Sequence, residues 1–155
     1  MYRLLGSLDE ARPIYERALR IAEASVGPDN PLVASALNNL GELYRAQSSF
    51  SQAEPMYRRA ISIREQFLGP DHPDLAQSLN NLALLYAAFK KPTEVEPLYQ
   101  RAMGIYRKAY GEDSAPLSAT MSNLAELYRR QEKYEHSGAA FAARLIFAGK
   151  TLRCR

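Results

Sequence analysis

The residues best suited to chemistry in this chain are asparagines that recur at a fixed interval. Asn39, Asn81 and Asn123 lie 42 residues apart, and each is followed by a leucine. An asparagine side chain carries both a hydrogen-bond donor and an acceptor, so it can pair with a peptide backbone unit without reading its sequence. The same side chains could instead bond within the protein and hold neighbouring helices in register. Both interpretations stay open at this point.

The side chains that usually carry catalysis or bind metals form no recognisable group. His72 lies in a turn, where a helix cap is its simplest role, and His136 is too distant to give metal-ligand spacing. The segment Gly149-Lys150-Thr151 is similar to the end of a phosphate-binding loop, but Arg144 stands where that motif requires glycine. No histidine is expected near Cys154, so a catalytic cysteine–histidine pair is not predicted. We therefore expect no enzyme, no metal site and no cofactor.

Composition places the chain among ordinary soluble domains. It has 155 residues, of which 46% are apolar and 24% charged, and no apolar run is long enough for a membrane span. Residues 137–155 hold four bases and no acid, so the remaining 16 bases face 17 acids and the body is nearly neutral. Nucleic-acid binding needs a clustered basic surface, which only this tail offers. One cysteine indicates a reducing compartment, and we expect the cytoplasm.

A 42-residue repeat organises the chain as one domain over residues 1–155. Several columns keep this interval, and chance cannot align so many: Gly27, Gly69 and Gly111; Tyr2, Tyr44, Tyr86 and Tyr128; Tyr15, Tyr57 and Tyr99. We divide the chain into a partial unit at 1–26, units at 27–68, 69–110 and 111–152, and within the last a divergent C-terminal helix at 135–152.

Each complete unit is predicted to form two helices. In the first of them, Asn30 is a good N-cap and Pro31 suits the first helical position. Apolar residues then follow at spacings of four, three and four, which is typical of one helix face. A second helix is expected to begin near Ser51 and to end before Gly69, with Arg64 on its polar side. One helix pair cannot bury its apolar stripe alone, so the pairs must stack around a continuous core.

These columns resemble the tetratricopeptide repeat. The resemblance covers roughly residues 2–136 and rests first on a pattern in the leading helix of each unit: Leu37, Leu40-Gly41 and Tyr44; Leu79, Leu82-Ala83 and Tyr86; Met121, Leu124-Ala125 and Tyr128. The interval of 42 is longer than the ordinary 34 of this family. It is similar to the kinesin-light-chain type of repeat, whose turn is matched completely by Gly69-Pro70-Asp71-His72-Pro73. The resemblance implies a right-handed all-α solenoid.

In that family the first helices line a concave groove that binds a peptide segment of a partner. The resemblance therefore implies a scaffold or adaptor for protein–protein interaction, with the peptide-binding role on the asparagine columns. The candidate groove residues are Ser35, Asn38, Asn39, Arg45, Gln77, Asn80, Asn81, Ser122, Asn123 and Arg129.

Arginines in one column could give the groove an affinity for acidic groups. Arg45 and Arg129 could meet a carboxylate or phosphate, because the guanidinium fork suits both. Ala87 interrupts the column, and Glu42 and Glu126 flank it with opposite charge. A solvated face of mixed charge is the alternative interpretation.

The two ends of the array depart from the repeat pattern. Tyr2 aligns with Tyr44, which predicts that the chain begins near the end of a first helix. In the last unit, Arg144 stands where Ala102 predicts alanine. These ends suggest a second hypothesis, a structural spacer or self-association module that contacts partners through its exposed ends. In either case we expect a protein or peptide partner, and neither a nucleic acid nor a membrane.

Overall fold

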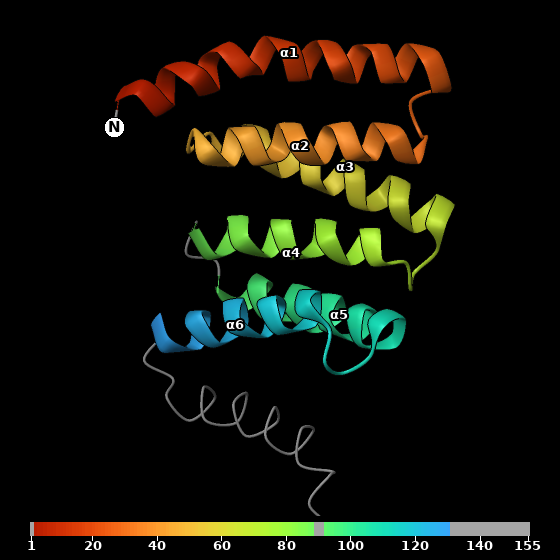
Figure 1. Cartoon of the computed structure of the whole chain (residues 1–155), viewed down its shortest axis with the longest axis vertical. Coiled ribbons are helices and arrows are strands. Elements are labelled where there is room, and N and C mark those ends of the chain that lie inside the picture. Colours follow the sequence, from red (N-terminus) through yellow and green to blue (C-terminus); the bar gives the residue numbers. More distant parts are fainter. Residues whose placement is uncertain (1, 89–91, 131–155) are drawn as a thin grey trace, which may run out of the picture.

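A computed structural model describes residues 2–88 and 92–130, which form six helices (Figure 1). In chain order they are α1 (Tyr2–Val26), α2 (Pro31–Ala46), α3 (Phe50–Leu68), α4 (Pro73–Ala88), α5 (Pro92–Tyr110) and α6 (Ala115–Arg130). These two ranges contain no strand, so the predicted all-α class is confirmed. The helix predicted at 135–152 lies outside the described residues, as do His136, Arg144, the Gly149–Thr151 segment and Cys154.

Local chemistry fixes where the helices begin and end. The side-chain oxygen of Asn30 accepts a hydrogen bond from the Leu32 N–H at 2.9 Å, so the predicted cap of α2 is confirmed. His72 caps α4 through its Nδ1, which accepts from the Asp74 N–H at 3.2 Å. The glycine that follows each second helix has φ between 82° and 88°, a left-handed conformation that favours glycine.

The helices alternate between two layers. The first helices α2, α4 and α6 follow one another along the array, while α3 and α5 pack against them as second helices (Figure 1). A close approach joins the first such pair: at Gly41 of α2, an added Cβ would lie 2.9 Å from Cε1 of Tyr57 in α3. Tyr57 and its equivalent Tyr99 in α5 are both fully buried. These tyrosines therefore form part of the core, as predicted.

Polar contacts repeat along the array as well. The hydroxyl of Tyr44 donates to Glu16 at 3.1 Å, and that of Tyr86 donates to Glu54 at 2.7 Å, so each tyrosine reaches the preceding second helix. Successive second helices are joined by ion pairs in a single column, Arg59 with Glu23 and Arg101 with Glu65. These contacts help to set the spacing of the units.

The expectation that the chain begins with the end of a first helix is wrong. Residues 2–26 form one helix of 25 residues, which runs straight through positions that form a turn in the next unit. That turn places Ser48 at φ 58°, a conformation that costs energy and that the packing of α2 on α3 compensates. The continuous helix satisfies its backbone hydrogen bonds internally and has no such turn.

Candidate functional site

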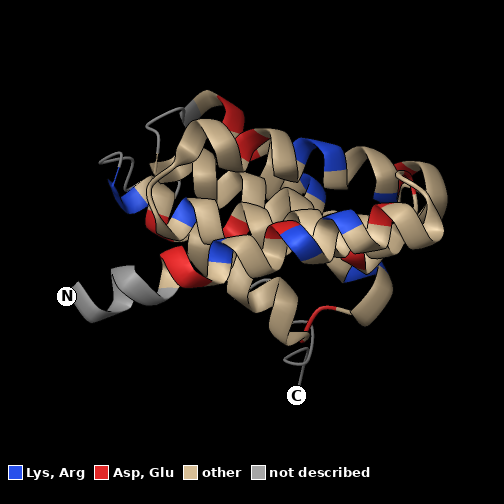
Figure 2. Ribbon diagram, turned by 90° about the horizontal axis from the view of Figure 1, so that it is seen from above, with Lys and Arg blue, Asp and Glu red and all other residues tan. Residues whose placement is uncertain are grey.

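The predicted interaction surface lies on the first helices α2, α4 and α6. In the principal asparagine column, Asn39 is exposed, whereas Asn81 and Asn123 are half-buried. Acidic and basic segments are interspersed along the described helices when they are seen down the stack (Figure 2). On the first helices Arg45 pairs with Glu42 and Arg129 with Glu126, which agrees with the mixed-charge alternative.

Three of the five candidate asparagines bond between neighbouring first helices. Nδ2 of Asn123 in α6 donates to Oδ1 of Asn80 in α4 at 3.3 Å. Asn38 in α2 is only 4% exposed, and its Oδ1 accepts from the hydroxyl of Ser78 in α4 at 3.3 Å. This geometry favours the register-holding interpretation for these three side chains. Neither Asn39 nor Asn81 forms a side-chain hydrogen bond to another described residue.

A buried arginine joins three helices beneath this surface. Arg64 of α3 is 3% exposed, so its assignment to the polar side of the helix is wrong. Its Nη1 donates to the backbone oxygen of Asp74 and to the hydroxyl of Ser78, both at 2.7 Å. Its Nη2 donates to the hydroxyl of Ser35 in α2 at 3.3 Å. Desolvation lowers the pKa of this guanidinium, and the negative charge of Asp74 opposes that shift.

One sequence signal could have revealed this arginine. The buried positions of α3 include Ala53, Tyr57 and Ala60, at spacings of four and three, and Arg64 comes four residues later. It therefore continues the apolar stripe of the helix rather than the polar face. Ser35, a predicted groove residue, is half-buried as part of this arginine's hydrogen-bond network.

Arg45 lies where the last turn of α2 meets the core. Its Nη2 is 3.9 Å from Oε1 of Glu42, and its side chain is 35% exposed. Burial raises the pKa of Tyr57 to about 12, and the nearby charge of Arg45 partly opposes this shift. The arginine therefore sits close to a buried phenol as well as to solvent.

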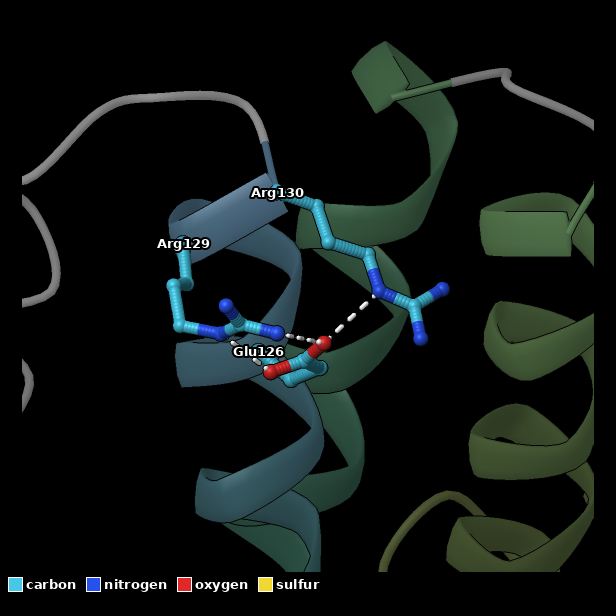
Figure 3. A network of polar contacts seen from close by, with 3 residues as sticks. All are labelled: Glu126, Arg129 and Arg130. Atoms are coloured by element: carbon cyan, nitrogen blue, oxygen red, sulfur yellow. Dashed lines mark hydrogen bonds and ion pairs between the residues drawn. The ribbon is translucent and has the colours of Figure 1, made fainter.

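Arg129 is held in an ion-pair network at the end of α6 (Figure 3). Nε and Nη2 of Arg129 donate to the two carboxylate oxygens of Glu126 at 2.7 and 2.8 Å, and Nε of Arg130 donates to Oε1 at 2.7 Å. Hydrogen bonds from both arginines lower the pKa of Glu126 to about 2. An acidic ligand at Arg129 would have to compete with this carboxylate.

The other polar candidates differ in their availability. Gln77 of α4 is exposed, and no side-chain hydrogen bond to a described residue engages it. Ser122 of α6 is exposed, but its hydroxyl donates to the Ser118 carbonyl at 3.0 Å, within the same helix. Among the candidates, the amides that can meet a ligand directly are therefore concentrated on α2 and α4.

The described residues lack two further kinds of feature. They contain no group of three or more histidine, cysteine or acidic side chains arranged to hold a metal ion. Among the six helices, none combines the length and the apolar character needed to cross a membrane.

Comparisons with known proteins agree with this geometry. A family model of the tetratricopeptide repeat matches residues 1–66, 52–108 and 90–141. No curated protein matches the sequence. The crystal structure of BtubC (BKLC) from P. vanneervenii is similar with a TM-score of 0.80 and 25% identity, over 99% of this chain and 62% of that one. The chain thus spans less than two thirds of the length of BtubC.

Two further solved structures are similar in fold. The crystal structure of a candidate kinesin light chain from Podosopora anserina, with nearly identical TPR-like repeats, has a TM-score of 0.83 at 21% identity. The match covers 98% of this chain and 72% of that one, and a single-substitution variant of the same protein gives the same values. At this identity the likeness shows the fold alone.

Proposed function

The chain belongs to the tetratricopeptide repeat family, whose repeats generally mediate protein–protein interactions, and on this premise we propose that it binds an extended segment of a partner protein along its first helices. The observation that carries the proposal is the row of amides formed by Asn39, Gln77 and Asn81 on adjacent helices. Each is at least partly exposed and is not engaged by another described side chain.

The spacing of the row suits an extended peptide. Packed helices lie about 8–10 Å apart, and an extended chain rises about 3.3 Å per residue. Amides on α2 and α4 would therefore meet backbone groups about three residues apart in the bound segment. Such contacts recognise the backbone of the bound segment. Its side chains would lie beside Glu42 and Arg45, which carry opposite charges. We expect affinity on the order of micromolar, because the peptide must be ordered on binding.

The test separates the open amides from those that bond between helices. A proteome-derived peptide-display selection is run on the wild type and on the triple variant Asn39→Ala, Gln77→Ala, Asn81→Ala. The matched control is the double variant Asn80→Ala, Asn123→Ala, which removes the same chemistry from the bonded pair. We expect the triple variant to lose the enriched peptides at unchanged thermal stability. The double variant should keep them at a lower melting temperature.

Two results would contradict the proposal. If the wild type enriches no peptide class, the amide row does not bind extended segments. If the same peptides are enriched on the wild type and the triple variant, binding occurs elsewhere on the molecule. The cytoplasmic location that the single cysteine indicates stays a prediction, and a fluorescent fusion would test it.

A further inference from the structure

The first helix α4 differs from its two neighbours at one place on the proposed binding surface. Both neighbours carry an acid and an arginine three residues apart that form an ion pair: Glu42 with Arg45 in α2, and Glu126 with Arg129 in α6. At the equivalent positions α4 carries Leu84 and Ala87. Along the row of first helices, an apolar pair therefore lies between two ion pairs.

This apolar pair continues into a small surface, which we call the α4 patch and which consists of Leu84, Ala87 and Ala88. The second and third residues are three and four positions after the first, so all three share one face of the helix. Leu84 and Ala87 are half-buried and pack against the hydrophobic core, while Ala88 is exposed. Alanine is much smaller than the arginine of the neighbouring helices, so the patch leaves room for a side chain from outside.

The α4 patch lies beside the amide row on the same helix. Leu84 comes three residues after Asn81, which places the two on one face and about 4.5 Å apart along the helix axis. An extended chain rises about 3.3 Å per residue and directs successive side chains to opposite sides. A segment whose backbone pairs with Asn81 would therefore bring one of its side chains onto the patch within about one residue of that contact.

The charges around the patch favour an apolar side chain at this point. Asp74, in the first turn, is the single charged residue of α4. On α6 the carboxylate of Glu126 already accepts hydrogen bonds from Arg129 and Arg130. A charged side chain on the patch would lose part of its hydration without gaining an ion-pair partner from α4. An apolar side chain gains free energy by covering Leu84.

We propose that the α4 patch selects a large apolar side chain in the bound segment, at the point where the segment crosses α4. Polar or charged side chains then face the ion pairs of α2 and α6. The inference rests on the proposed function, because the amide row must hold the segment over the patch. Leu84 and Ala87 determine specificity in this arrangement, whereas the amides hold the backbone of any sequence.

A library of random 12-residue peptides displayed on phage is the probe, and it is selected on the full chain. We expect the enriched peptides to share a large apolar residue at one position. Replacement of that residue with alanine in a synthetic peptide should raise the Kd about tenfold, because burial of its side chain is lost. Fluorescence anisotropy measures this change.

The variant Leu84→Glu, Ala87→Arg gives α4 the ion pair that its neighbours carry. The same pair is compatible with α2 and α6, so the helix should be retained, which circular dichroism verifies. The variant should bind the wild-type peptides about tenfold more weakly and enrich peptides without the apolar position. If the double variant loses helicity, Ala87→Arg alone makes the same test. Ala109→Arg is the matched control, because it adds the same charge at an exposed alanine of the second helix α5, and it should bind like the wild type.

Two results would overturn this inference and leave extended-segment binding intact. The first is a set of enriched peptides that depend on the amide row but share no apolar position. The second is an unchanged Kd of the wild-type peptides for the variant with charges on the α4 patch. Enrichment of no peptide class on the wild type would overturn both proposals together.

Discussion

Replacing Arg64 with alanine tests whether a buried cation joins the first two complete units. The guanidinium donates to Ser35 on α2 and to Asp74 and Ser78 on α4, while the side chain belongs to α3. It is 3% exposed, so the substitution removes both the hydrogen bonds and most of the packing at the point where these helices meet.

The magnitude follows from opposing contributions. A hydrogen bond to a charged group contributes about 1.5–3 kcal/mol, and three are lost. Desolvation of the charge, which also lowers the pKa of Arg64, costs several kcal/mol and offsets most of this gain. The cavity left by the side chain then dominates, because the hydroxyls of Ser35 and Ser78 keep their own hydrogen bonds to Pro31 and Asn38. We expect Arg64→Ala to reduce the free energy of unfolding by about 2–4 kcal/mol.

Arg64→Met is the matched control, because methionine fills similar space without charge. It removes the hydrogen bonds of the guanidinium but creates little cavity, so we expect a loss of about 1 kcal/mol. The assay is urea unfolding monitored by circular dichroism. The slope of the unfolding free energy against urea concentration is compared among the variants. A loss below about 1 kcal/mol for the alanine variant would refute the joining role of Arg64. Equal losses for the two variants would refute the packing argument.

Three further outcomes are expected. Gly41→Ala should lower stability by about 1 kcal/mol in urea unfolding, because the added Cβ would meet the buried Tyr57 ring. Gly104→Ala, whose added Cβ meets nothing within 4 Å, should raise stability by about 0.5–1 kcal/mol. A gain in stability at both sites would contradict the close approach of α2 and α3. Burial raises the pKa of Tyr57 and Tyr99 to about 12, so the unfolded state loses these protons first. The contribution of these two tyrosines to stability should be constant below pH 10 and fall between pH 10 and 12. The measurement is the tyrosinate absorbance of the wild type compared with that of a variant with Phe at both sites. Ionisation of these two phenols near pH 10, before helicity is lost, would contradict this order. Two arginines lower the pKa of Glu126 to about 2. The carboxylate therefore stabilises the fold above about pH 4.5, and this contribution is lost as the pH falls towards 2. The melting temperatures of the wild type and of Glu126→Gln should converge over this range.

Helices α2 to α6 and their order were predictable from the sequence because they depend on local chemistry. The cap at Asn30, the glycine after each second helix and the apolar spacing within each helix act over a few residues. The 42-residue interval then implies that equivalent residues have equivalent neighbours, which correctly placed Tyr57 and Tyr99 in the core.

The same reasoning fails where a residue's neighbours come from another helix. The asparagine columns were predicted as one surface, yet Asn38 and Asn123 bond across to the neighbouring first helices while Asn39 is exposed. Arg64 was placed in solvent because its type is charged, although it continues the buried stripe of α3. Each outcome depends on contacts between residues far apart in the chain.

The sequence by itself determined the family, helices α2 to α6 and the columns of equivalent residues. The tertiary structure decided which members of a column are buried, which are paired and which are open. One column of tyrosines shows the reason: Tyr15 and Tyr57 share it, but Tyr15 is 38% exposed and Tyr57 is fully buried. A repeat fixes the residue at each position, whereas burial depends on whether another helix is packed against it.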